Sequence, residues 1–331
     1  MVYAGGCHGE TWYNYPSGGI KYVLNRIAVA VASNDYVVPC FDSPSFRTQM
    51  FKDYKNGREK RPDIYSQIET LYEGLQSCGI KCEKYDGYEA DDIIEWAVAD
   101  NYEKYVRGIE IYGNDRDLCH SIRNNVIFRT TNSAMVDVTP TNFSKALYKG
   151  VEIPYNTISA YKVFCGCHSD GIPAIKIKKG IKGIELYRLW CKVCGGPGKL
   201  CNRGIGANPE AIRIFGKKSG IFTEEELEEL EKRIKLIYPA VKPDGITIEP
   251  TRGSAVDKIK LGSFMNRYGA KDAVRCIGQH CEPLTDNEKQ LLTDKAQALQ
   301  SGAYAADKNL ERRAKSIRST CIDLDAFTRG C

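Results

Sequence analysis

Short apolar runs alternate with amphipathic stretches through the first 140 residues of the chain. In the longer stretches apolar residues recur at helical spacing, and each shorter run is bounded by charged or turn-forming residues. The pattern predicts helices over 20–32, 62–78 and about 89–105, and strands over 35–41, 80–85, 109–112 and 125–129. Strand–helix alternation is typical of a parallel sheet flanked by helices. We therefore predict an α/β fold that binds ligands at the carboxyl ends of its strands.

The pattern becomes helical from about residue 142 to residue 239. Thr223, followed three residues later by Glu226, forms a capping box that predicts a helix over 223–237. A Cys- and Gly-rich insertion occupies 191–206, and a charged helical pattern over 286–319 is broken near Gly302. We predict domains at 1–140 and 141–240, and a mixed C-terminal region of unknown role at 241–331.

Composition narrows the class of protein. The chain has 331 residues, of which 42% are hydrophobic and 27% charged, as in globular proteins. No apolar run approaches the roughly 20 residues of a membrane helix, and the first ten residues lack the layout of a signal peptide. We therefore expect a cytoplasmic protein without a membrane partner. Its 14 cysteines are then free thiols or zinc ligands, and its net charge of +5 mildly favours an anionic partner.

Carboxylates gather at the ends of the predicted elements. They are Asp42 after one strand, Asp115 and Asp117 after another, and Glu89, Asp91 and Asp92 at the start of a helix. One interpretation is that these groups cap helices. The other is that they bind divalent cations, because carboxylates that converge repel each other unless a cation lies among them. Such hard oxygen ligands favour Mg²⁺ or Mn²⁺, and two such ions can hold a phosphodiester during hydrolysis.

A further acidic residue, Asp170, lies in the segment 166–173 at the start of a basic region. The lysines that follow it are Lys176, Lys178, Lys179 and Lys182. They either contact backbone phosphates of a nucleic acid or form a solvated face.

Five segments give the chain a resemblance to the 5′→3′ exonuclease and flap endonuclease family, which includes bacterial polymerase-associated and phage members. They are Phe41-Asp-Ser-Pro-Ser-Phe-Arg47, Tyr54-Lys-Asn-Gly-Arg58, Gly87-Tyr-Glu-Ala-Asp-Asp-Ile93, Asn114-Asp-Arg-Asp-Leu118 and Ser169-Asp-Gly-Ile-Pro173. The resemblance implies a PIN-like nuclease domain at 1–140, followed by a helix–hairpin–helix-type DNA-binding region. It also implies that the basic lysines after Asp170 hold duplex DNA.

The same resemblance assigns site residues. It implies a first metal ion bound by Asp42, Glu89, Asp92, Asp115 and Asp91, and a second bound by Asp117 and Asp170. It further implies that Arg47, Lys55 and Arg58 act on the scissile phosphate and the 5′ strand.

Three departures from the family pattern change the expectation. The sequence begins after the strand that normally carries the first Asp, so we expect no counterpart of that carboxylate. Cys167 stands where the family has an Asp, and a soft thiol is a poor Mg²⁺ ligand, so the second ion should bind weakly. The hairpin's Gly-x-Gly is replaced by Ile177-Lys-Lys179, which puts close approach to phosphates in question.

The insertion suggests a structural zinc site. Cys191, Cys194 and Cys201 have part of a zinc-ligand spacing, and Cys167 is a candidate fourth ligand, with Cys165 and His168 as alternatives. The other interpretation is that these are free thiols.

The sequence thus predicts a two-metal 5′→3′ exonuclease or flap endonuclease that acts on DNA with a free 5′ end or a 5′ flap. We expect it in the cytoplasm of a bacterial or phage-infected cell, with replication proteins as further partners. One alternative is a catalytically impaired protein of the same fold that binds branched DNA. Another is a zinc-stabilised nuclease of structured RNA.

Overall fold

The computed structural model describes most of the chain and divides it into two compact units. The described residues are 10–56, 61–101, 103–104, 108–113, 115–122, 125–130, 137–139, 141–142, 153, 157–193 and 209–301. The first unit contains those within 38–59 and 83–250, and the second contains those within 2–37, 60–82 and 251–331. The predicted domain boundaries at 140 and 240 stay predictions.

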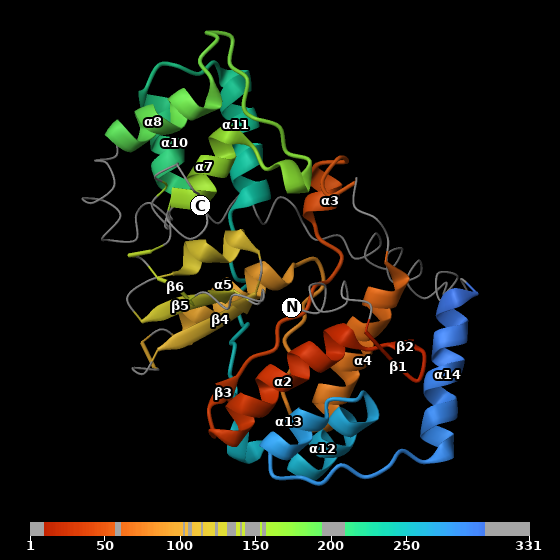
Figure 1. The fold of residues 1–331 in the computed structure, drawn as a ribbon. Coiled ribbons are helices and arrows are strands. Elements are labelled where there is room, and N and C mark those ends of the chain that lie inside the picture. The colour runs from red at the N-terminus through yellow and green to blue at the C-terminus, as the bar shows by residue number, and fades with distance from the viewer. Residues whose placement is uncertain are drawn as a thin grey trace. The chain divides into compact units, whose positions relative to one another are not determined.

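The sheet of the first unit has three strands, β4 (Ile109–Gly113), β5 (Val126–Thr130) and β6 (Asp137–Val138). The strands β4 and β5 are parallel, whereas β6 pairs antiparallel with β5 (Figure 1). Along β5, Val126 and Phe128 are buried and alternate with half-buried residues, because successive side chains of a strand point to opposite faces. The core beside this sheet also contains Val98 of helix α5 (Ala90–Asn101). A short 3₁₀ helix, η1 (Arg116–Ser121), follows β4.

A second core of the first unit lies among the helices α7 (Ile158–Cys165), α8 (Gly183–Val193), α10 (Pro209–Lys218) and α11 (Glu224–Ile237). The first unit also contains α3 (Arg47–Met50) and the 3₁₀ helix η3 (His168–Asp170). Phe164, Trp190 and Phe215 are buried together in this core. The predicted capping box is confirmed, since the Thr223 side chain accepts from the Glu226 amide and Glu226 reaches back to the Thr223 amide.

The second unit is mainly helical. Its elements are β1 (Thr11–Trp12), β2 (Tyr15–Pro16), α2 (Gly18–Ala32), β3 (Tyr36–Val37), α4 (Pro62–Ser77), β7 (Thr251–Arg252), η6 (Gly253–Ala255), α12 (Lys258–Arg267), α13 (Lys271–Cys276) and α14 (Asp286–Gln300). Close packing of α4 against α12 depends on Gly74, because a Cβ there would lie 2.2 Å from the Phe264 ring.

The predicted helices over 20–32, 62–78, 89–105 and 223–237 are confirmed as α2, α4, α5 and α11. The predicted strands over 109–112 and 125–129 are confirmed as β4 and β5.

Two predicted strands were wrong in extent or pairing. Only Tyr36–Val37 of the run 35–41 is a strand, and it pairs antiparallel with β7. Pro39 lacks an amide hydrogen and restricts the residue before it, which ends the strand. The run 80–85 forms only an isolated parallel bridge, between Cys40 and Glu83.

The helical pattern predicted over 286–319 is confirmed as far as Gln300, where α14 ends, and residues 302–331 lie outside the described part of the chain. Across the described residues, every helix is too short or too polar to span a bilayer.

Candidate metal centre

The start of helix α5 and the segment after Phe41 are held together by backbone hydrogen bonds. The amide of Ser43 donates to the Tyr88 carbonyl at 3.1 Å, and the amide of Phe46 donates to the Gly87 carbonyl at 2.9 Å. As a result the exposed Asp42 lies beside the first turn of α5, where its Oδ1 accepts from the Ala90 amide at 2.8 Å. This turn also carries three further acidic residues.

Glu89 is buried and accepts hydrogen bonds from three side chains. Tyr54 donates to its Oε2 at 2.9 Å, Lys55 to its Oε1 at 2.6 Å, and Arg47 to its Oε2 at 3.3 Å. Burial and the neighbouring Glu89 charge raise the pKa of Tyr54, which keeps the phenol protonated as a donor. These donors compensate the charge of a carboxylate that would otherwise be costly to bury.

Asp92 is bound on both of its oxygens. Arg47 donates to Oδ2 at 2.8 Å and to Oδ1 at 2.7 Å, and the amides of Ala240 and Glu89 donate to the same oxygens at 2.8 and 3.0 Å. Burial alone would raise the pKa of Asp92, but the Arg47 guanidinium holds it below its ordinary value. Arg47 is only 3% exposed and also donates to the carbonyls of Leu236 and Tyr238.

Asp91 faces an excess of negative charge. Burial and then the carboxylates of Asp115 and Asp42 raise the pKa of Asp91 to about 7. Glu89 adds to this rise, and Lys55 opposes it. The four carboxylates of this first acidic cluster (Asp42, Glu89, Asp91 and Asp115) therefore converge on one place at the start of α5.

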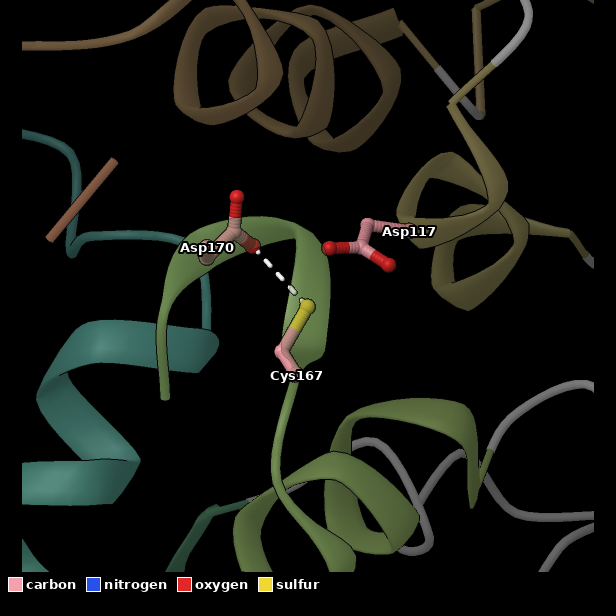
Figure 2. Close-up of side chains that lie close together, drawn as sticks. All are labelled: Asp117, Cys167 and Asp170. Carbon is pink, nitrogen blue, oxygen red and sulfur yellow. Dashed lines mark hydrogen bonds between the residues drawn. The ribbon is translucent and has the colours of Figure 1, made fainter. Parts of the chain in front are cut away.

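A second acidic cluster consists of Asp117, Cys167 and Asp170, shown in Figure 2. One oxygen or sulfur atom of each residue lies within 4.8 Å of the others. Cys167 is 5% exposed, and its Sγ donates to Oδ2 of Asp170 at 3.0 Å. Lys162 of α7 forms an ion pair with Oδ1 of Asp117. The two aspartates in this cluster thus have proton donors supplied by the chain itself.

Backbone contacts connect the two acidic clusters. The Asp115 side chain accepts from the Asp117 amide at 3.0 Å, and the Lys55 amide donates to the Asp170 carbonyl at 3.1 Å. Gly171 makes the second contact possible, because it has φ +73° and a Cβ there would lie 2.7 Å from the Asp53 carbonyl oxygen. All seven acidic residues singled out in the sequence therefore belong to one region of the first unit.

The basic residues expected to bind DNA are exposed. Lys176, Lys178, Lys179 and Lys182 lie on the segment between η3 and the start of α8, where they alternate with or follow the buried Ile175 and Ile177. Lys178 pairs with Glu225 at 3.0 Å, and Lys179 donates to the Gly220 carbonyl at 2.7 Å.

Several predicted site residues fall elsewhere. Arg58, Cys194 and Cys201 lie outside the described residues. Cys191 is half-buried in α8, and Cys167 belongs to the second acidic cluster.

The sequence pattern did not reveal the part played by Lys162. A lysine in a helix is ordinarily solvated, and only the tertiary fold brings this one to Asp117.

The sequence of this chain is similar to those of several known proteins. A family model described as "5'-3' exonuclease, N-terminal resolvase-like domain" matches residues 12–147. The 5'-3' exonuclease of Mycoplasma genitalium is 36% identical over 162 residues, which cover 47% of this chain and 54% of that protein. That of Mycoplasma pneumoniae is 26% identical over 257 residues, with 74% and 81% covered. The DNA polymerase I of Streptococcus pneumoniae is 27% identical over 282 residues, with 83% and 30% covered.

The chain therefore spans about half the length of the first of these relatives and less than a third of the polymerase. A solved structure of T5 5'-exonuclease with bound zinc ions covers 85% of this chain and 90% of its own, at 12% identity and a TM-score of 0.44. A likeness with so low a score supports no conclusion about this chain.

The class defined by the sheet and its acidic edge is a PIN-like, resolvase-like α/β domain. Residues 12–147 match the N-terminal domain of the 5'-3' exonuclease family, and 5'-3' exonucleases are among the similar proteins, in agreement with the predicted resemblance.

Proposed function

We propose that this chain is a divalent-metal-dependent nuclease that hydrolyses DNA phosphodiesters at a free 5′ end or a 5′ flap. The observation that carries the proposal is the convergence of the first acidic cluster at the start of α5. Lys55 donates to Glu89 of this cluster and opposes the repulsion between its carboxylates. Like charges this close are favourable only when a cation joins them. The two Mycoplasma relatives named above are themselves described as 5'-3' exonucleases.

The donor set of this cluster fits Mg²⁺ or Mn²⁺. Its side-chain donors are carboxylate oxygens, the ligands these hard cations prefer. Asp42 and Asp115 are both exposed, and each uses one oxygen to accept from a backbone amide, so the other oxygen can face an ion. Asp91 is the third candidate ligand. When bound, a divalent ion of this kind activates water as a nucleophile and neutralises the phosphate.

Lys55 is proposed to hold the scissile phosphate. Its ammonium lies 2.6 Å from Glu89, a quarter of its side chain is exposed, and its backbone has φ +55°. A left-handed backbone at a residue other than glycine costs on the order of 1–3 kcal/mol and persists where the surrounding structure demands it. The contact to Asp170 supplies that constraint. In this proposal the Lys55 ammonium neutralises the negative charge that develops on the phosphate.

Arg47 and Asp92 are proposed to position this site. Their mutual ion pair is almost fully buried and uses both oxygens of Asp92, which leaves Arg47 without access to a substrate. The pair instead orients the first turn of α5, and with it Glu89. Arg58 retains its proposed role at the phosphate.

The basic segment is proposed to hold duplex DNA by its phosphates, as part of a helix–hairpin–helix-type region within 141–240. The exposure of all four lysines supports contacts that are salt-sensitive and independent of base sequence.

We further propose a structural zinc ion bound by Cys191, Cys194 and Cys201. We also propose that the protein is cytoplasmic and that replication proteins are its partners.

The second candidate is a branched-DNA-binding protein with impaired catalysis. It is favoured by the thiol of Cys167 in the second acidic cluster and by the ion pair between Lys162 and Asp117.

A labelled 5′-flap duplex separates the two candidates when it is incubated with Mg²⁺, Mn²⁺ or EDTA. The nuclease predicts metal-dependent cleavage that disappears in Asp115→Asn and persists in Asp244→Asn, a matched change at an exposed loop residue. Tight binding without product under either metal contradicts the nuclease and supports the binding protein.

A further inference from the structure

We infer that the ammonium group of Lys162 takes the place of a second divalent ion, so that the metal centre binds a single catalytic cation. This inference rests on the proposed nuclease, since it concerns the same site. It assigns a role to Lys162 and explains why a cysteine is tolerated at position 167.

Each aspartate of the second acidic cluster has one oxygen engaged by a proton donor of the chain. Lys162 donates to Asp117. The Cys167 thiol donates to Asp170 at 3.0 Å (Figure 2). A divalent ion bound by all three residues would have to displace the thiol proton, because a metal ligand must be deprotonated, and it would lie beside the ammonium, which repels it. Cys167 is 5% exposed and its sulfur is a poor partner for Mg²⁺.

The balance of charge differs between the two acidic clusters. In the second, the ammonium of Lys162 pairs with Asp117, and Asp170 adds a further carboxylate, which leaves one net negative charge. In the first, Lys55 and Arg47 both pair with Glu89, and Arg47 also pairs with Asp92. With Asp42, Asp91 and Asp115, five carboxylates meet these two cations, which leaves a larger excess of negative charge. The electrostatic demand for an external divalent cation is therefore concentrated at the start of α5.

The fold holds Lys162 in place. Its neighbours Val163 and Phe164 are fully buried, and only 14% of the Lys162 side chain is exposed. The helix ends just after it at Gly166, which has φ +84° and a backbone position where a Cβ would lie 2.5 Å from Pro173. Its low exposure and its ion pair with Asp117 restrict the Lys162 ammonium more than the exposed lysines of a surface ion pair.

The number of bound Mn²⁺ ions tests this inference, measured on the full chain without DNA by the electron paramagnetic resonance signal of free Mn²⁺. We expect about one ion per chain in the wild-type protein, in contrast to a two-metal site. The double variant Lys162→Met/Cys167→Asp supplies a third carboxylate and removes the ammonium, so it should bind about two ions.

Further variants keep the result interpretable. Lys162→Met alone should create a second, weaker site, whereas Lys162→Arg, which keeps the charge, and Lys192→Met, at an exposed residue of α8, should leave the number at its wild-type value. If the double variant fails to fold by circular dichroism, the comparison of Lys162→Met with Lys162→Arg decides.

Two bound ions in the wild-type protein, or no gain in the variants that remove the ammonium, would overturn the inference. The measurement is independent of cleavage. A chain that binds one Mn²⁺ yet cuts no flap DNA leaves this inference standing and contradicts the proposed nuclease. A wild-type chain that binds none contradicts both.

Discussion

Arg47 donates two parallel hydrogen bonds to Asp92, of 2.7 and 2.8 Å, and both side chains are at most 4% exposed. The same guanidinium reaches the carbonyls of Leu236 and Tyr238, so one side chain links the start of α5 to the end of α11. Removal of one member of a buried pair leaves the other charge without compensation.

Arg47→Met is therefore expected to lower the free energy of unfolding by about 3–5 kcal/mol, the loss typical of a broken buried ion pair. Urea unfolding followed by circular dichroism measures it. The double variant Arg47→Met/Asp92→Leu should recover much of the loss, because it removes both charges. Arg188→Met, at an exposed residue of α8, is the control. A loss as small as that of the control would mean that the pair does not anchor the helix.

Lys55→Ala should slow cleavage by about 10²–10³-fold, because the lysine stabilises charge on the phosphate. Single-turnover cleavage of a 5′-flap duplex at saturating Mg²⁺ measures the effect. If Lys55→Ala and Lys192→Ala cleaved equally fast, the proposed phosphate contact would be wrong.

Tyr54→Phe removes one donor to Glu89 and should cost about 1–3 kcal/mol of stability, with a smaller effect on rate.

The sequence predicted the local features of this fold better than its long-range pairing. The helices α2, α4 and α11 followed from hydrophobic spacing and a capping box, which act over a few residues. The antiparallel partner of β3 could not be predicted, since β7 lies more than two hundred residues later in the chain.

The same distinction applies to the site. Asp42, Asp91 and Asp115 were singled out because each follows or opens a predicted element, although the strand predicted before Asp42 ends at Val37. Nothing in the sequence around Arg47 or Asp92 indicates that the two residues form a buried ion pair. An arginine beside a metal-binding motif suggests contact with substrate until its burial is known.

Substitutions of Gly171 and Gly180 test whether the hydrogen bond from the Lys55 amide to the Asp170 carbonyl matters. Both have a positive φ, at +73° and +72°, but a Cβ would meet the Asp53 carbonyl at 2.7 Å only at Gly171 and would have open space at Gly180. Gly180→Ala should cost about 1 kcal/mol, the strain of a left-handed alanine. Gly171→Ala should cost clearly more, about 2–4 kcal/mol, and should also slow cleavage because it shifts Lys55. Thermal unfolding and single-turnover rates of both variants measure these effects. If the two variants behaved alike, close packing at Gly171 would not be what holds Lys55 beside Asp170.

The lysines after η3 should set the salt dependence of DNA binding. Lys176 and Lys182 are exposed, and Lys178 and Lys179 are exposed although each also contacts the protein. Removal of one lysine that neutralises a phosphate should reduce the slope of log affinity against log salt by about 0.9 on duplex DNA. Fluorescence anisotropy with a 5′-flap duplex in Ca²⁺ measures this slope without cleavage. Lys176→Ala and Lys182→Ala should each lower it, and Lys178→Ala should lower it less, because Glu225 already competes for that ammonium. Lys192→Ala is the control. Equal slopes in all five proteins, the wild type included, would exclude this segment from the DNA interface. A uniform loss of affinity across unrelated duplex sequences would confirm that the segment contacts phosphates and reads no bases.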